Sequence, residues 1–489
     1  MIAAMTVPYI IAQAQATLVD PHACTDSPDV VTVLGAVFDT LVRKGPDGHW
    51  LPALATSWQV SDDACMFDFR LRTGIAFHNG DAMDGAAVRY TLERMARPDM
   101  GATLGAPGVY AQYLAGATVE VLDAHGIRVT FAEPFAEFFD ILAHGHIVSP
   151  RAVEAAGEDL AARMVGTGPY RLTKWEADRF IEAEALPDHF DGRPTKRSLR
   201  WQKVADAGTR ASMLSQGAVH AAMHLNTKEV QAFACRADLT FAETLDPTAI
   251  VFLFNAARGP MRDPRIRRAL NLAIDRGALV TRIIADQGQP LHGFISPVHF
   301  GATPIDQAAA NMPYDPVRAR ALLVEAGFGT GLTIRVDRPE KLPDEAATLT
   351  AEVARQLAAI GVTADVHVDA DRIRYANRVR LKQIGDLCLF DSSPMSTFRV
   401  LYEKIDARSQ GSWWQGFSNP EVESLIDQAR RTVNDEARGD LYRKCYRHLQ
   451  TDPPWLYLYN HRRIAGFAGH LHKQSFNLNC TLDVRALRD

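Results

Sequence analysis

The stretch that decides the fold is residues 332–368, LTIRVDRPEKLPDEAATLTAEVARQLAAIGVTADVHV. It opens with an alternating apolar segment at residues 332–336, a pattern typical of a β-strand. Apolar side chains then recur at helical spacing, at Leu349, Val353, Leu357 and Ile360. Gly361 ends this helix, and residues 362–368 alternate again as a second strand. Strand, helix and strand in this order predict two parallel neighbouring strands of an α/β sheet.

A further strand is predicted at residues 386–390, DLCLF, after a helical segment at about residues 371–382. This strand leads directly to a carboxylate, Asp391. In open α/β sheets, ligands bind in the crevice beyond the carboxyl ends of the strands, so Asp391 is a candidate ligand-binding residue. The alternative is that Asp391 caps the following turn or helix, helped by Ser392 and Ser393.

Residues 262–284, RDPRIRRALNLAIDRGALVTRII, predict a helix. Asp263 serves as its N-cap and Pro264 takes the first helical position. We expect one continuing apolar face, formed by Ile266, Leu270, Ala273, Ile274, Val280 and Ile284.

Residues 314–328 repeat the capping pattern, with Asp315 as N-cap and Gly327 as terminator. In the first half of the chain, residues 65–71 alternate as a strand, and residues 86–96 show helical spacing. Strands and helices are therefore expected throughout the chain.

Length and composition narrow the class of protein. A chain of 489 residues favours more than one folded lobe. Its net charge of −5 gives no reason to expect nucleic acid or an anionic membrane as partner.

Six cysteines are scattered singly, at positions 24, 65, 235, 388, 445 and 480. Without a CxxC pair, a zinc or redox site has little support, whereas one or two disulfides and buried thiols both remain open.

The beginning of the sequence bears on location. No Lys or Arg precedes Arg43, so no basic segment stands before the apolar residues 7–16, VPYIIAQAQA. As written, the sequence is expected to carry no secretory signal. An intracellular location, a signal already removed and a signal upstream of the given start all fit this observation.

The usual catalytic motifs are missing. The sequence contains no GxxxxGK[ST], HExxH or GxSxG, and no carboxylate spacing singles out an acid/base pair. His144 and His146 stand two residues apart and cannot share one helical face, so we expect solvated loop histidines there and no metal. These absences make catalysis the weaker expectation.

Several segments together resemble one family, the extracytoplasmic solute-binding proteins of ABC importers in the peptide/nickel class. The longest is residues 61–95, SDDACMFDFRLRTGIAFHNGDAMDGAAVRYTLERM, with an acidic pair before a strand and then L-R-x-G-x-x-F-H-x-G. The others are residues 165–175 (VGTGPYRLTKW), 254–275 (FNAARGPMRDPRIRRALNLAID), 314–328 (YDPVRARALLVEAGF), 416–430 (GFSNPEVESLIDQAR) and 452–459 (DPPWLYLY). Six matches in the family's order make the resemblance specific.

The resemblance implies a two-lobed periplasmic-binding-protein-like α/β fold of the large peptide-binding class, with an extra subdomain inserted in the first lobe. The implied boundaries place lobe I at residues 1–34, 165–255 and 466–489, the insertion at 35–164, and lobe II at 256–465. Two strands would cross between the lobes, near residues 254–257 and 464–467.

The resemblance also implies a ligand site. In peptide-binding members of the family, an Asp after the strand that matches DLCLF pairs with the ligand's α-amino group, and Asp391 occupies that position. Such a carboxylate, in a closed and water-poor cleft, binds a cation at low effective dielectric. The family often shows a second acid, as in D-x-x-D-P, whereas this sequence has serine, serine and proline after Asp391. Phe390 and Ser392, which flank Asp391, are further candidates.

Trp413 and Trp414 are the remaining candidate ligand-binding residues, in the segment SWWQGFSNP at residues 412–420. If this segment is extended, the two side chains point to opposite faces. One of them would then stack on an apolar or cationic part of the ligand. The alternative is that one belongs to the core and the other forms a lid contact.

The function implied by the resemblance is non-enzymatic capture of a small, polar, amine-bearing solute, a peptide or peptide-like molecule, by hinge closure of an interlobe cleft and delivery to a permease. Its partners are that solute and the membrane subunits of an ABC importer, with no cofactor, metal or nucleic acid, and the chain acts as a monomer. The location is periplasmic, or cytoplasmic if the given start is genuine. Alternatives are a metal chelate or other non-peptide ligand, a signal-less intracellular ligand sensor, and an enzyme on a two-lobed scaffold.

Overall fold

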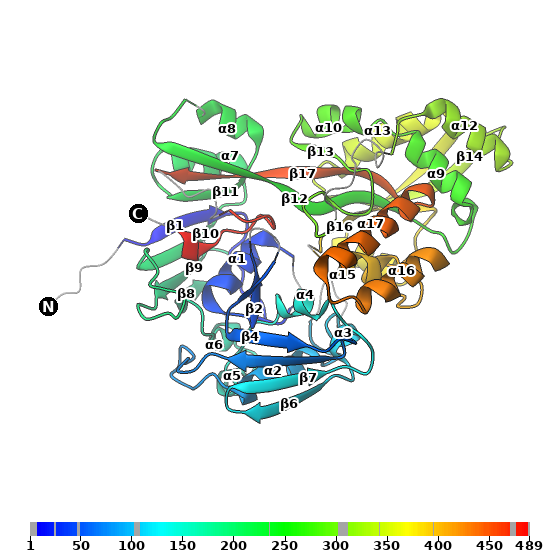
Figure 1. Ribbon diagram of the computed structural model, residues 1–489. Helices are drawn as coiled ribbons and strands as arrows, with labels where there is room; N and C mark the ends of the chain where they lie inside the picture. The colour runs from blue at the N-terminus through cyan, green and yellow to red at the C-terminus, as the bar shows by residue number, and fades with distance from the viewer. Residues whose placement is uncertain are drawn as a thin grey trace. The chain divides into compact units, whose positions relative to one another are not determined.

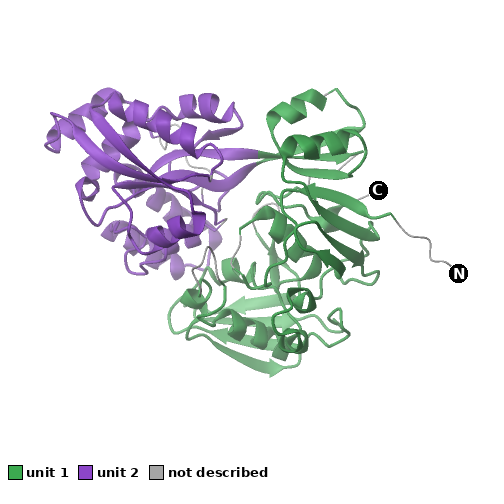
Figure 2. Cartoon of the chain, turned by 180° about the vertical axis from the view of Figure 1, so that it is seen from behind, with its two compact units in different colours: residues 1–103, 107–244, 463–489 green, residues 104–106, 245–462 purple. Residues whose placement is uncertain are grey.

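The computed structural model describes residues 7–23, 26–45, 49–101, 108–233, 235–301, 312–341, 343–394, 396–469 and 476–487 (Figure 1). Two compact units make up the chain (Figure 2). The first comprises residues 1–103, 107–244 and 463–489, and the second comprises residues 104–106 and 245–462. The chain passes from one unit to the other within two long strands, β12 (Leu239–Phe254) and β17 (Trp455–Ala468).

The first unit contains a mixed sheet. Strand β1 (Tyr9–Gln13) is parallel to both β10 (Ser198–Lys203) and β11 (Ala221–Leu225). Beyond β10, the antiparallel strands β9 (Phe180–Ala185) and β8 (Tyr170–Glu176) extend the sheet. The helices of this region are α1 (Pro28–Val37), α7 (Ala207–Ser215) and α8 (Thr227–Phe233). Apolar side chains of α1 and of the sheet form one core cluster, which includes Val33, Val37, Tyr170, Ile181 and Trp201.

A second, antiparallel sheet lies within the first unit, in the order β4 (Ala55–Val60), β5 (Met66–Leu71), β7 (Gly126–Thr130), β6 (Thr118–Asp123). Helix α2 (Gly85–Met95) contacts β6 and β7 and begins at Asp84, whose side chain accepts from the Ala87 amide. Both elements predicted from residues 61–95, the strand and the helix, are confirmed. The shorter elements nearby are β2 (Val42–Lys44), β3 (Trp50–Pro52), α3 (Ala111–Leu114), α4 (Phe138–Leu142), α5 (Pro150–Ala156), α6 (Leu160–Arg163) and, near the C-terminus, η3 (Val484–Ala486).

A buried polar cluster in the first unit corrects one expectation. His146 is only 8% exposed and is not a solvated loop histidine. Its backbone carbonyl lies 2.9 Å from His22 Nε2, and Arg94 Nη1 lies 2.7 Å from His22 Nδ1. Arg94 and Arg163 both pair with Asp20, at 2.6 and 3.0 Å. The His-Gly-His spacing carried no signal of this burial, because the cluster is assembled from segments distant in the chain.

Protonation in this cluster is set by burial and by Arg94. Burial, with the Arg94 charge added, lowers the pKa of His22 to about 3. Burial also lowers the pKa of His146 to about 4. Although burial by itself would raise the pKa of Asp20, hydrogen bonds and the charge of Arg94 lower it to about 2. At neutral pH the two histidines are therefore neutral and the aspartate is charged.

The second unit contains the other end of the sheet, in the order β15 (Val362–Asp369), β14 (Leu332–Pro339), β16 (Leu387–Ser392), β12, β17. Strand β14 is parallel to both β15 and β16, which confirms the predicted parallel pair, and β16 is antiparallel to β12. The other elements of this unit are η1 (Pro260–Arg262), β13 (Gly288–Pro290), α12 (Pro316–Glu325), α13 (Ala346–Ala358), α14 (Arg372–Arg380), α15 (Thr397–Lys404), α16 (Pro420–Arg430) and α17 (Asp435–Thr451).

The segment predicted as one helix is two, α9 (Pro264–Leu272) and α10 (Arg276–Ile284). Asp263 caps the first, as predicted, and Asp275 caps the second by accepting from the Ala278 amide. The buried Arg276 guanidinium donates to the carbonyls of Asn271 and Ile274, between the end of α9 and the start of α10. A buried cation that satisfies these carbonyls makes the break stable.

Candidate functional site

The candidate site lies where the parallel strands β14, β15 and β16 end. Asp391 is the penultimate residue of β16 and is paired across the sheet with Ile250 of β12. It therefore belongs to the strand itself, one residue before its end. The following helix, α15, is capped by Ser396, whose side chain accepts from the Arg399 amide. Asp391 is not the cap of that helix.

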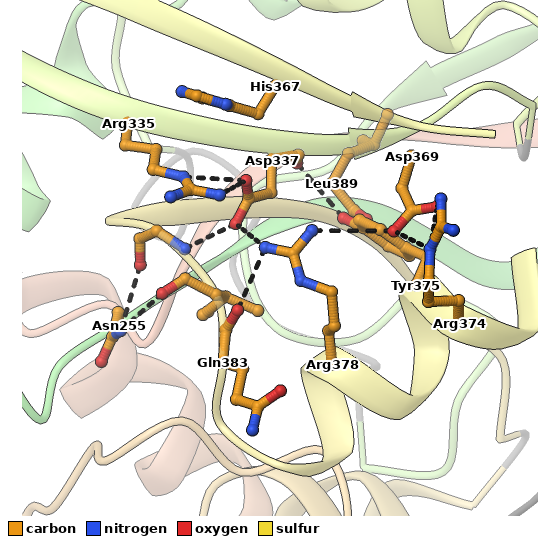
Figure 3. Close-up of polar contacts among 12 residues, drawn as sticks. Asn255, Arg335, Asp337, His367, Asp369, Arg374, Tyr375, Arg378, Gln383 and Leu389 are labelled. Atoms are coloured by element: carbon orange, nitrogen blue, oxygen red, sulfur yellow. Dashed lines mark hydrogen bonds and ion pairs between the residues drawn. The ribbon is translucent and has the colours of Figure 1, made fainter. Parts of the chain in front are cut away.

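A buried carboxylate, Asp337, fixes β14 against its neighbours in the second unit (Figure 3). Asp337 is 1% exposed and accepts from the Gly385 amide at 2.6 Å. Arg335 and Arg378 contact its two oxygens, at 3.1 and 3.2 Å. The Tyr375 hydroxyl donates to the carbonyls of Asp337 and Leu389, at 3.2 and 2.7 Å. This network ties β14, α14 and the start of β16 together and so sets the position of Asp391.

We expect Asp337→Ala to lower the free energy of unfolding by about 2–3 kcal/mol. Loss of one partner of a buried ion pair costs roughly 3–5 kcal/mol, and the value here is smaller because Arg378 reaches solvent and rehydrates. Urea denaturation measures the change. Asp365→Ala is the matched control, because Asp365 is 63% exposed and pairs with His367 on the edge strand β15. Equal denaturation midpoints for the two variants would contradict this role of Asp337.

Asp391 has one described partner, Arg372. Arg372 Nη2 lies 3.3 Å from Asp391 Oδ1, and the two side chains are 25% and 24% exposed. The Arg372 guanidinium also lies 5.8 Å from the centre of the Phe390 ring. The candidate carboxylate is thus accessible to solvent and already faces a cation.

Phe390 and Ser392 flank Asp391 in β16, Trp413 packs on Phe390, and all three are buried. The rings of Phe390 and Trp413 lie 4.9 Å apart, and these residues are 4% and 6% exposed. Ser392 is 2% exposed, and its hydroxyl has no hydrogen-bond partner among the described residues. Phe390 and Trp413 therefore form a packed pair of rings next to the strand end.

Trp414 has a different environment. Its segment forms a turn closed by the Trp414 amide on the Gly411 carbonyl at 3.0 Å, so the extended geometry considered for the tryptophan pair does not occur. The Trp414 indole donates to the Phe417 carbonyl at 2.6 Å. Lys382 Nζ lies 5.9 Å from the Trp414 ring and donates to the Gly411 carbonyl. Burial, followed by the Arg380 charge, lowers the pKa of Lys382 to about 8.

Arg372 is the residue of this site that the sequence did not single out. It occupies the first position of α14, directly after the N-cap Asp371. A cation at a helix N-terminus opposes the helix dipole. The unfavourable position of this basic residue was the sign that the sequence offered. It indicates a site residue only when the structure places Arg372 beside Asp391.

Other site types gain no support. Within the described residues, no group of three or more His, Cys, Asp or Glu side chains could hold a metal ion. No disulfide joins two of the five described cysteines, and Cys388 and Cys445 are buried thiols. Cys24 lies outside the described residues. No helix in the described part of the chain has both the length and the apolarity to span a membrane.

Comparison with known proteins gives the class and then the family. The sequence profile of bacterial extracellular solute-binding proteins, family 5 (middle region), matches residues 49–393. The chain is therefore a solute-binding protein, and its family is one of binding proteins and not of enzymes. It belongs to the bacterial extracellular solute-binding proteins of family 5, and the resemblance recognised in the sequence is confirmed.

Individual proteins of similar sequence or structure are consistent with this family and this fold. The glutathione-binding protein GsiB of Salmonella typhimurium is 27% identical over 466 residues, covering 93% of this chain and 89% of the relative. The periplasmic binding protein DppA of Helicobacter pylori, solved with the peptide STSA, has a TM-score of 0.79 at 20% identity, covering 98% of this chain and 97% of that one. HbpA2 of Haemophilus parasuis has a TM-score of 0.83 at 18% identity, with coverage of 98% and 99%. The predicted fold class, two-lobed and periplasmic-binding-protein-like, is confirmed.

Proposed function

We propose that this chain is the periplasmic substrate-binding protein of an ABC importer. It captures a small, polar, amine-bearing solute, a peptide or peptide-like molecule, between its two lobes. Closure about β12 and β17 then presents the loaded form to the permease. The observation that carries the proposal is Asp391, a partly exposed carboxylate at the carboxyl ends of parallel strands in a solute-binding protein.

The ligand chemistry follows from the charge and surroundings of Asp391. An ammonium group bound there gains a charge-assisted hydrogen bond, which is roughly twice as strong as a neutral one. Asp391 is 24% exposed in this structure, so closure over a ligand would exclude water from the carboxylate and strengthen its interaction with an ammonium group. Relatives named for glutathione and a structural neighbour bound to a tetrapeptide fit an amine-bearing ligand of peptide character.

The proposal is tested by mass spectrometry of whatever co-purifies with the protein, followed by a thermal-shift screen. The screen pairs each free peptide with its N-acetylated form, which lacks only the amine. We expect the free form alone to raise the melting temperature, because a ligand at 100 times its Kd stabilises a protein by about 2.7 kcal/mol. A screen in which only anionic, uncharged or metal-chelate compounds stabilise the protein would overturn the amine assignment.

A further inference from the structure

Strand β15 is the outermost strand of the sheet in the second unit, and no described strand pairs with its outer side. It pairs with β14 in one unbroken parallel register, from Leu332 with Val362 to Pro339 with Asp369. Exposed edge strands are usually protected by a proline, a lysine or a bulge, and β15 contains none of these. It is therefore a long, regular edge to which another strand can be added.

The backbone of β15 shows which residues face this open side. The Leu332 amide donates to the Gly361 carbonyl at 3.1 Å, and the Glu340 amide donates to the Asp369 carbonyl at 2.9 Å. In a parallel pair, every second residue directs its N–H and C=O groups to the neighbouring strand, and the residues between direct theirs to the other side. The residues of β15 whose backbone groups point away from β14 are therefore the even-numbered ones, Val362, Ala364, Val366 and Val368.

The side chains in the second half of β15 are exposed on both faces of the strand. On one face, Val366 is 39% exposed and Val368 is 53% exposed. On the other face, the Asp365 and His367 side chains are 63% and 44% exposed, and His367 Nε2 lies 2.9 Å from Asp365 Oδ2. Because successive side chains alternate between the faces, one face of this edge is apolar and the other carries an acid and a base. A strand that completes the edge has to match both faces.

We infer that β15 pairs with the β15 strand of a second copy of this chain, antiparallel and about a two-fold axis at Val366. This pairing sets even-numbered residues opposite each other, so the outward backbone groups of the two copies form about six hydrogen bonds. On the apolar face, Ala364 of one copy lies opposite Val368 of the other. On the polar face, Asp365 of one copy lies opposite His367 of the other. The interface is isologous, so each of these contacts occurs twice.

Neighbouring registers match less well. A two-fold axis at Asp365 would set the two Asp365 carboxylates opposite each other, and an axis at His367 would set Asp365 opposite Asp369. Like charges directly opposite one another destabilise a sheet. An axis at Ala364 would leave Val368 beyond the end of the opposing strand. Charge and apolar complementarity therefore favour a second copy, paired in this one register, as the occupant of the edge.

We expect the dimer to be weak and reversible. Stable interfaces bury at least about 1,000 Å², and a contact confined to one strand of eight residues lies near this lower limit. A dissociation constant of about 10–300 μM is therefore expected. The monomer expected from the family resemblance is then the form at low concentration. The inference concerns a surface other than the candidate site, so it holds whichever solute the protein binds.

Sedimentation of the full chain between about 5 and 500 μM tests the inference. We expect a monomer–dimer equilibrium that Val366→Lys weakens by about tenfold or more, because two lysines would face each other at the axis. Val366→Glu should weaken it in the same way. An equimolar mixture of the two variants should associate as a heterodimer, since a lysine then faces a glutamate.

Val324→Lys is the matched control, because Val324 is a 63% exposed valine of helix α12 and should leave the equilibrium unchanged. A chain that stays monomeric at about 500 μM would overturn the inference, and so would a dimer that Val366→Lys does not weaken. Two monomeric variants that fail to associate when mixed would rule out pairing about Val366. A monomeric chain whose Val366→Lys variant no longer binds the permease would assign the edge to a different partner and equally overturn the dimer.

Discussion

Asp391→Ala lowers ligand affinity by roughly 30- to 4,000-fold, which corresponds to about 2–5 kcal/mol of binding free energy. The loss is large because the ligand ammonium would give up its hydration on binding without gaining a counter-charge, while Arg372 stays beside it and repels it. Stability of the free protein should change by about 1 kcal/mol or less, since the pair is partly exposed and makes a single long contact. Titration calorimetry with the co-purified solute measures the affinity, and thermal melting measures the stability.

Two further variants separate the charge of Asp391 from its shape. Asp391→Asn keeps the size and one hydrogen-bond acceptor, so most of the affinity loss should persist if the charge matters. Asp365→Ala removes a solvated carboxylate of the same unit and should leave the affinity unchanged. Unaltered affinity in Asp391→Ala, accompanied by lowered stability, would assign Asp391 a structural role and place the ligand elsewhere.

Acidification from pH 7 to pH 5 should destabilise the protein by roughly 4 kcal/mol through His22 and His146. Their pKa values are about 3 and about 4 in the folded chain, while an unfolded histidine titrates near 6.5. Between these values the unfolded chain binds more protons than the folded one, so stability falls as the pH drops. Protonation of His22 in the folded state is resisted because its second ring nitrogen faces the Arg94 guanidinium. The lowered pKa of Asp20 adds a further loss of stability only below about pH 4.

Calorimetric melting at pH 7, 6 and 5 measures this dependence. His146→Asn keeps a side-chain donor toward the Pro21 carbonyl and removes one titrating group, so its decline between pH 7 and 5 should be about half as steep. His367→Asn is the control, because His367 is 44% exposed and its loss should leave the slope unchanged. If His146→Asn does not fold, NMR titration of the wild-type histidines gives the same information. A melting temperature that is constant from pH 7 to 5 would contradict neutral, buried histidines.

The sequence predicted the secondary structure correctly where that structure depends on neighbouring residues. Strand β5, helix α2, the Asp263 and Asp315 caps and the parallel pair β14–β15 follow from alternation, helical spacing and capping residues. The expected single helix at 262–284 failed because its break depends on a buried arginine side chain that satisfies the exposed carbonyls. Apolar spacing continues through the break and so could not show it.

In the candidate site, too, the sequence indicated what depends on adjacent residues, and only the structure showed the contacts between distant residues. Asp391 stood out because a charge follows an apolar strand, and that is a property of adjacent residues. Its partner Arg372 lies 19 positions earlier in the chain, and the hydrogen bond between Gly385 and Asp337 that anchors the strand joins residues 48 positions apart. The burial of His146 depends on Pro21 and His22, which are more than 120 positions away.

The sequence by itself determined several strands and helices, the family and the carboxylate near the end of β16, because periodicity, caps and motifs depend on neighbouring residues. Only the tertiary structure decided which charge faces which. The contact of Arg372 with Asp391, the packed ring of Trp413 and the neutral state of His146 follow from it. The physical reason is that burial and ion pairing depend on distances between segments, and those distances exist only after the chain has folded.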